Sequence, residues 1–325
     1  MHIILNSYGT SLQREQNRFV VYTQDDKNHI PPGKVKSISI SKGARISSDA
    51  VLLAIEHEID LLFTDGKGMP QGRVWSVQYG SISTIRKNQV EFIFSAKAVA
   101  WVKELLQYKM DNQLALLLTL DPPDEEARRT ILRAINALED HKQKLSRVEG
   151  EVVADVAPSL RGWEGAASRR YFAAINTVLP ASYQFERRSK HPATDPFNAL
   201  LNYGYGMLYG KVEGALIRAG IDPYVGVFHR DDYNRPVLVY DVIERFRIWI
   251  DYVVLQLCRE EVFPEECFVE QNGGLWLEGL GKRILIQSVN DYLAEVVRLD
   301  GQDRSRQQHI QRYAHQLASF FQKTA

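Results

Sequence analysis

The chain has 325 residues, of which 45% are hydrophobic and 25% are charged. A chain of this length can bury a sizeable core and commonly forms two domains. The 40 Lys and Arg residues balance the 40 Asp and Glu residues. This balance excludes a wholly basic nucleic-acid binder, although a local basic face can still bind DNA.

Composition also bears on the compartment. The two cysteines, Cys258 and Cys267, fit no zinc-binding spacing and indicate a reducing environment. The first residues lack the basic region and long apolar run of a signal peptide, and the longest aliphatic run, residues 114–118, is too short to span a bilayer. We therefore expect a soluble, cytoplasmic protein that does not enter a membrane.

The first part of the chain is typical of β-structure. Short runs rich in β-branched or aromatic residues alternate with turn clusters such as Pro31-Pro32-Gly33, and one helix interrupts them at residues 48–58. The strands are expected at residues 3–5, 19–22, 35–40 and 59–63. We predict a β-rich domain over residues 1–84.

From about residue 85 the pattern becomes helical. Ser95, Asp124 and Asp195 stand where helix N-caps are expected, and Gly220 follows the last helical residue of its segment. The fold class is therefore predicted to be α+β, with the β-rich domain followed by a mainly α-helical domain over residues 85–325.

Residues 159–179 form one of the expected helices and carry an acid among small residues. Glu164 lies between Gly162 and Gly165. Glycine inside a helix costs about 1 kcal/mol relative to alanine, so two of them require a reason. Close helix packing is one reason, and the close approach of a phosphate backbone is the other.

Basic residues follow this acid in two groups. Arg169 and Arg170 lie within two turns of it, and Arg187, Arg188 and Lys190 occupy the loop beyond the helix. Some of them are candidates to line a DNA path, whereas the alternative is that they are ordinary surface charges.

Residues 221–251 bring a histidine and carboxylates together. An apolar extended run ends at His229, and a second, residues 237–240, meets a helix expected to begin at Asp241. Asp241 and Glu244 fall on one face of that helix. Imidazole and carboxylates suit a divalent ion such as Mn²⁺ or Mg²⁺. However, an acid followed three residues later by glutamate is also a capping box, which the helix alone favours.

These pieces, in this order, resemble one family. GWEGAASRRYF is similar to the glutamate motif of CRISPR-associated protein one, the integrase of CRISPR adaptation. The segment DPFNALLNYGYGMLYGKVEGALIRAGIDPYVGVFH resembles the approach to that family's histidine, and VLVYDVIERFRIWID resembles its acidic helix. The resemblance covers at least residues 160–251 and extends more weakly over the N-terminal strands.

The resemblance implies a function and a site. The family inserts new spacers into a CRISPR array when a DNA 3′-hydroxyl attacks a phosphodiester, with Mg²⁺ or Mn²⁺ as cofactor. Its metal ligands and catalytic residues correspond to Glu164, His229 and Glu244, with Asp241 as a possible auxiliary acid. It further implies an N-terminal β-sandwich, a homodimer that uses the β-rich domain, and as partners protospacer and repeat DNA and CRISPR-associated protein two.

Two other functions remain open at this point. One is a metal-dependent nuclease that cuts branched DNA in repair without integrating it, and the other is a non-catalytic scaffold whose acids only cap helices. The sequence contains no phosphate-binding loop and no nucleophilic triad, so nucleotide hydrolysis and covalent catalysis are unsupported.

Overall fold

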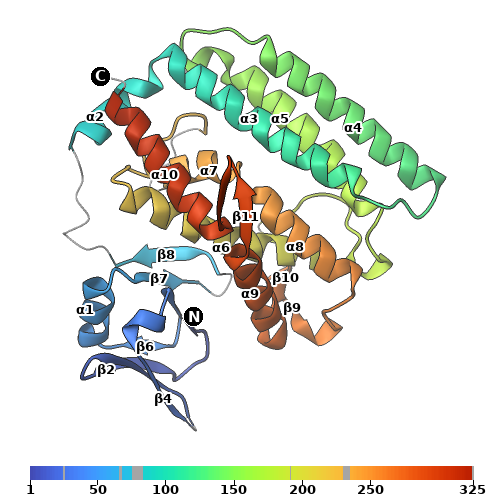
Figure 1. Cartoon of the computed structure of the whole chain (residues 1–325). Helices are drawn as coiled ribbons and strands as arrows, with labels where there is room; N and C mark the ends of the chain where they lie inside the picture. The colour runs from blue at the N-terminus through green and yellow to red at the C-terminus, as the bar shows by residue number, and fades with distance from the viewer. Residues whose placement is uncertain (25, 66–67, 75–82, 191, 230–234, 324–325) are drawn as a thin grey trace. The chain divides into compact units, whose positions relative to one another are not determined.

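The computed structural model describes residues 1–24, 26–65, 68–74, 83–190, 192–229 and 235–323. The chain divides into two compact units, Met1–Gly80 and Ser81–Ala325 (Figure 1). The first is built mainly from strands and the second mainly from helices. The predicted α+β class, with a β-sandwich-like region before a helical one, is confirmed.

The N-terminal unit contains two four-stranded sheets. One has the order β1-β5-β7-β8, whose first three strands are parallel, and the other has the order β4-β3-β2-β6. Side chains that alternate between the two faces of a strand explain the sequence of β5, SISIS. Its Ile38 and Ile40 side chains are buried, whereas the serines between them are not. The elements are β1 (His2–Leu5), β2 (Ser11–Glu15), β3 (Arg18–Tyr22), β4 (Lys27–Ile30), β5 (Ser37–Ser41), β6 (Arg45–Ile46), α1 (Ser48–Glu56), β7 (Asp60–Thr64) and β8 (Pro70–Arg73).

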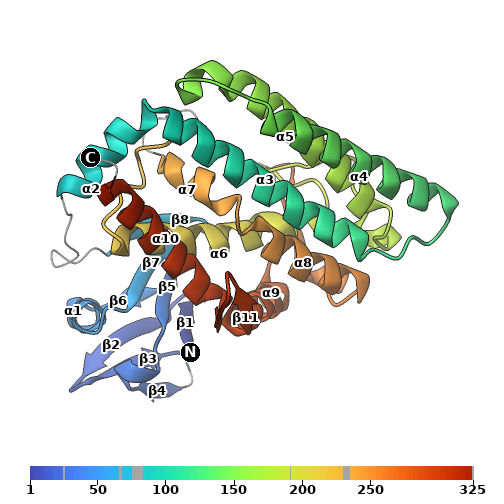
Figure 2. The same cartoon turned by 45° about the horizontal axis from the view of Figure 1, so that its top comes forward.

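The second unit is a helical assembly with two short hairpins. Three of its long helices, α3, α4 and α5, lie side by side in both views (Figures 1 and 2). The helices are α2 (Ser83–Ile93), α3 (Ala96–Leu118), α4 (Glu125–Ser146), α5 (Val153–Asn176), α6 (Pro196–Arg218), α7 (Val237–Ile243), α8 (Arg247–Arg259), α9 (Gly279–Ala294) and α10 (Arg306–Lys323). The hairpins are β9 (Phe268–Gln271) with β10 (Gly274–Leu277), and β11 (Val296–Leu299) with β12 (Gln302–Ser305).

The helix starts follow the sequence signals. The side chains of Ser95, Asp124 and Asp195 each accept a hydrogen bond from the backbone N–H three residues on, as N-caps do. Gly220 adopts a φ of 82°, which a glycine tolerates after a helix end. Within the described residues, none of the helices combines the length and the apolar character that crossing a bilayer requires.

The segment before the acidic helix differs from the expectation. Residues 237–240 are not extended but form the first turn of α7, and the described residues 224–229 form no strand. Asp241 therefore lies inside α7 rather than at its start, and Glu244 is the residue at which α7 ends. The short apolar run VLVY can form either a strand or a buried helix, and packing against α6 decides for the helix.

Close packing of α6 on α8 positions this region. A Cβ added at Gly204 of α6 would lie 2.5 Å from Ile250 Cγ2 of α8, so only glycine allows the observed approach. A Cβ added at Gly162 of α5, in contrast, would meet nothing within 4 Å.

These two glycines give a matched pair of variants. We expect Gly204→Ala to lower the free energy of unfolding by about 1–3 kcal/mol through overpacking. Gly162→Ala should raise it by up to about 1 kcal/mol, because alanine is the better helix former. Denaturant unfolding followed by circular dichroism measures both. Equal stability of the two variants would contradict the packing described for Gly204.

Candidate metal and DNA site

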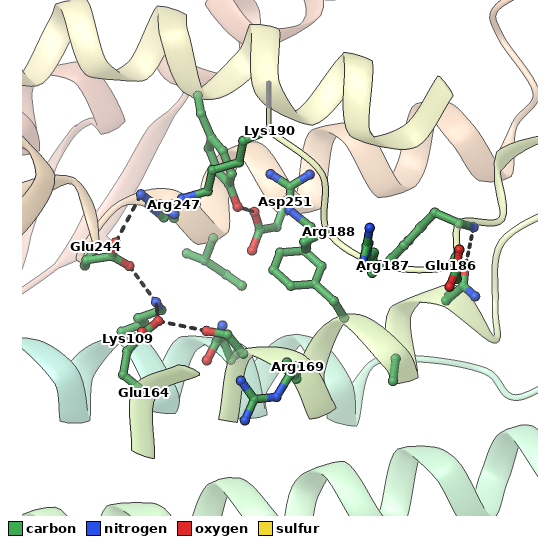
Figure 3. A pocket seen from close by; sticks show the side chains of 18 residues that line it. Lys109, Glu164, Arg169, Glu186, Arg187, Arg188, Lys190, Glu244, Arg247 and Asp251 are labelled. Atoms are coloured by element: carbon green, nitrogen blue, oxygen red, sulfur yellow. Dashed lines mark hydrogen bonds and ion pairs between the residues drawn. The ribbon is translucent and has the colours of Figure 1, made fainter. Parts of the chain in front are cut away.

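A buried lysine joins the two glutamates that the sequence singled out. Lys109 of α3 donates a short hydrogen bond to Glu164 Oε1 of α5, and its Nζ lies 2.7 Å from Glu244 Oε2 at the end of α7 (Figure 3). Lys109 and Glu244 are each 6% exposed, so the ion pair is largely shielded from water. Glu164, which also accepts from Ser168 Oγ at 2.9 Å, borders a cavity.

Helical spacing brings Lys109 to this place. The buried face of α3 is apolar on both sides of it, and Lys109 and Gln113 are its polar members. A charged side chain is seldom buried without a partner. The two glutamates supply that partner, so this buried lysine stays charged.

The three charges shift one another's pKa values. Burial lowers the pKa of Lys109, but Glu244 and Glu164 outweigh burial and raise it above its usual value. Burial raises the pKa of Glu244, but Arg247 and Lys109 overcome this and hold it at about 2. The pKa of Glu164 is likewise lowered, by Lys109 against burial. Both carboxylates are therefore ionised at neutral pH.

Arg247 completes the charge pairing of Glu244. Its Nη2 lies 3.1 Å from Glu244 Oε1, and its guanidinium lies over the Tyr205 ring at 4.8 Å from the centroid. Beyond it, the buried Asp251 accepts hydrogen bonds from Tyr205 and from Tyr171. Burial raises the pKa of Asp251 in spite of these bonds. Asp251 thus holds the hydroxyls of two tyrosines and lies near enough to Arg247 to raise the pKa of that guanidinium.

Asp241 organises the loop that carries the histidine. Its carboxylate, which is fully buried, accepts hydrogen bonds from the backbone N–H groups of Val227, Phe228 and His229 at 2.8, 3.1 and 2.9 Å. It also lies 2.6 Å from His229 Nδ1. Since a carboxylate only accepts, Nδ1 donates, and in the neutral ring the lone pair is then on Nε2. Asp241 therefore fixes the histidine instead of capping a helix.

Two more polar residues hold the same loop. The buried Gln89 of α2 donates to the carbonyls of Asp222 and Val225 and accepts from the Asp222 N–H. Arg161 of α5 donates to the Phe228 carbonyl at 3.0 Å. The backbone leading to His229 is thus tied to α2, α5 and α7.

The residues fit a divalent cation in part. Glu164 and Glu244 already converge on the ammonium of Lys109. Glu244 Oε2 forms an ion pair with this ammonium but accepts no well-aligned hydrogen bond from it. Carboxylate oxygens and one imidazole nitrogen form a suitable donor set for Mg²⁺ or Mn²⁺. Within the described residues, however, no three His, Cys, Asp or Glu side chains lie close enough to hold an ion. A protonated His229 would also lower the pKa of Glu244, which places the histidine in the neighbourhood of this glutamate.

A cavity of about 490 Å³ opens beside Glu164 and Glu244. The exposed Arg169 and Arg187, together with Lys190, border it (Figure 3), whereas Arg170 does not. Arg188 has a different role, because its guanidinium bonds Asn198 and Asn202 of α6 and lies over Phe172 and Tyr205.

The glycines beside Glu164 are not explained by helix packing. An added Cβ at Gly162 would meet nothing within 4 Å, and one at Gly165 would meet only Arg169 Nη1 at 3.7 Å. The surface at this turn of α5 is therefore open beside the acid, which leaves room for a phosphate backbone.

The sequence reasoning missed Lys109 and Arg247. Lys109 lies inside α3, which runs from Ala96 to Leu118. A signal was present, because Lys109 continues the spacing of Val102, Leu105 and Leu106 as a charge on an apolar stripe.

Comparison with known proteins identifies the family. The chain matches the family model described as CRISPR associated protein Cas1 over residues 3–291. Over 333 aligned residues it is 30% identical to CRISPR-associated endonuclease Cas1 1 of Archaeoglobus fulgidus. The alignment covers 98% of this chain and 96% of that protein.

Two solved structures share the fold. A casposase bound to integration product has a TM-score of 0.84 at 18% identity and covers 100% of this chain and 91% of that one. A Cas6-RT-Cas1–Cas2 complex has a TM-score of 0.81 at 20% identity, over 100% of this chain and 35% of that one.

An α+β chain with paired carboxylates beside a basic cavity is the architecture of a DNA-processing enzyme. The chain belongs to the Cas1 family. The predicted membership of the CRISPR-associated endonucleases is thereby confirmed. Endonucleases of this family are generally metal-dependent.

The contacts of Asp241 predict that replacing its carboxylate by an amide strongly lowers the free energy of unfolding. Asp241→Asn places an amide NH₂ among backbone donors, so at least one buried N–H loses its acceptor. We expect a loss of about 2 kcal/mol or more in the free energy of unfolding. His229→Ala, at a partly exposed ring, is the control and should cost less than about 1 kcal/mol. Chemical unfolding measures both, and a wild-type midpoint for Asp241→Asn would refute the role of the carboxylate.

Proposed function

We propose that Glu164, Glu244 and His229 form the metal-dependent strand-transfer site of this Cas1 protein. The observation that carries the proposal is the convergence of two ionised carboxylates, from α5 and from the end of α7, on one cation beside a basic cavity. Neither glutamate side chain caps the start of a helix, since Glu164 lies inside α5 and Glu244 at the C-terminal end of α7. The scaffold function is thereby disfavoured, since buried carboxylates without another role are costly.

The chain's residues have separable tasks in this site. Glu164, Glu244 and the Nε2 atom of His229 would hold the ion, and Asp241 orients the histidine through Nδ1. Arg247 holds the second oxygen of Glu244. Arg169, Arg187 and Lys190 would neutralise phosphates at the cavity. The open surface at Gly162 and Gly165 would let the DNA backbone approach.

The reaction requires little covalent chemistry from the protein. A 3′-hydroxyl oxygen loses its proton and bonds to phosphorus, the bond from phosphorus to the leaving 3′-oxygen breaks, and that oxygen takes up a proton in turn. A divalent ion held by these residues would polarise the phosphoryl oxygen and offset the charge of the pentavalent transition state. Carboxylates suit Mg²⁺, and the imidazole makes Mn²⁺ a good alternative.

The partners follow from the family. We propose protospacer and repeat DNA as substrates, CRISPR-associated protein two as the assembly partner, a homodimer that uses the β-rich domain of residues 1–84, and a cytoplasmic location. Support comes from the DNA-bound casposase and the Cas1–Cas2 complex that share the fold. Light scattering of the protein alone and with the partner tests the stoichiometry.

Joining assays test the ligand set and separate integration from cutting. Glu164→Ala, His229→Ala and Glu244→Ala should each abolish transfer of a labelled 3′-hydroxyl donor while DNA binding survives. His229→Ala is the most informative because, unlike the two glutamate variants, it leaves the charge pairs of the buried Lys109 intact, and the exposed His315→Ala is its control. Wild-type joining by all three variants would reject the site. Cleavage of branched DNA without joining by the native protein would favour the nuclease alternative.

The two neighbouring arginines should behave differently. Each phosphate contact contributes about 0.9 to the slope of log affinity against log salt for duplex DNA, or about 0.7 for single strands. Arg187→Ala should therefore flatten the slope by about that amount. Arg188→Ala should leave the slope nearly unchanged and lower the unfolding midpoint, because its partners are the buried Asn198, Asn202 and aromatic rings. The reverse pattern would place the DNA contact at Arg188.

A further inference from the structure

We propose that Lys109 is a displaceable counter-ion of the metal site. Its ammonium pairs with Glu164 and Glu244, and it must leave these oxygens before the two carboxylates bind the ion, with a DNA phosphate as its alternative partner. The inference rests on the metal-dependent function proposed above, and it assigns to Lys109 the coupling between metal binding and DNA binding.

The oxygens of Glu244 carry the first step of the argument. Oε2 lies 2.7 Å from Lys109 Nζ and Oε1 lies 3.1 Å from Arg247 Nη2. A metal ion that binds Glu244 must therefore take one of these oxygens from a cation. The same ammonium also bonds Glu164 Oε1, which keeps the hydrogen bond from Ser168 Oγ, so the departure of Lys109 frees Glu244 Oε2 and removes a positive charge from beside Glu164.

Of the two cations, Lys109 is the one able to leave. The planar guanidinium of Arg247 lies over the Tyr205 ring, feels the charge of Asp251 and is only partly exposed. The ammonium of Lys109 is a compact charge at the end of a flexible four-carbon chain. Lys109 also borders the cavity that Arg187 and Lys190 line, so a phosphate in that cavity is a near alternative partner.

Charge balance supplies the coupling. The formal charges of Glu164, Glu244, Lys109 and Arg247 cancel, so a divalent ion brings two uncompensated positive charges into a buried site. DNA phosphates provide the missing negative charge and accept the lysine. Metal and DNA should then strengthen each other's binding by the same factor, as linkage requires.

Binding of Mn²⁺ alone, followed by the paramagnetic resonance signal of the free ion, tests the competition. Removing one positive charge about 5 Å from a divalent ion should tighten the binding of that ion about tenfold or more, even at the dielectric constant of water. Lys109→Met should therefore bind Mn²⁺ at least about tenfold more tightly than the wild type without DNA. Lys109→Arg keeps the charge and should bind no more tightly than the wild type.

The same titration with a short duplex tests the coupling. The duplex ends in 3′-dideoxy nucleotides so that it cannot attack, and a titration of the DNA alone corrects for Mn²⁺ that it binds. DNA should tighten Mn²⁺ binding to the wild type by a larger factor than to Lys109→Met.

Glu164→Gln separates this inference from the function on which it rests. If Glu164→Gln loses Mn²⁺ binding while Lys109→Met binds it no more tightly than the wild type, the role of Lys109 is refuted and the metal site stands. Wild-type Mn²⁺ affinity in Glu164→Gln would reject the metal site itself.

A measurement on the wild-type protein does not depend on how well Lys109→Met folds. Labelling by an amine-reactive ester, read at Lys109 by mass spectrometry, reports the exposure of its ammonium. Saturating Mn²⁺ should increase labelling of Lys109, and the dideoxy duplex should reduce it again by providing a phosphate partner. Unchanged labelling with saturating Mn²⁺ would overturn the displacement.

Discussion

The placement of the two site glutamates in the helical unit depends on one buried ammonium, that of Lys109. Lys109 of α3 neutralises carboxylates from α5 and from the end of α7, so three helices meet at one charge. Removing one partner of such a group leaves an uncompensated charge, which typically costs about 3–5 kcal/mol. The pairing therefore fixes where the two glutamates stand, and the same pairing limits what else can bind them.

A second layer of polar contacts holds the histidine in place. Asp241 accepts from three consecutive backbone N–H groups, and Gln89 binds the residues just before them. These side chains are buried and satisfied, so they act as structure, whereas the His229 ring is partly exposed. Rigid support of an exposed functional group is the usual arrangement in a site that must orient a ligand.

The sequence predicted the helix caps and the strand-rich start well, because those signals are local. It placed the start of α7 wrongly, since VLVY is apolar in either state and only its packing on α6 selects the helix. Glu164, His229 and Glu244 were singled out through the family resemblance and stay predictions as ligands. Lys109 was missed because its partners lie 55 and more residues away, and Arg188 could not be told from Arg187 without knowing which one is buried.

Diffraction at the manganese absorption edge from crystals grown with Mn²⁺ and DNA would test the role of the carboxylate pair. We predict an anomalous peak within bonding distance of Glu164 and Glu244, with His229 Nε2 turned toward it and the Lys109 ammonium on a phosphate oxygen. A peak elsewhere, or a Lys109 still seated between the two glutamates beside a bound ion, would contradict a site in which the lysine and the metal exclude each other.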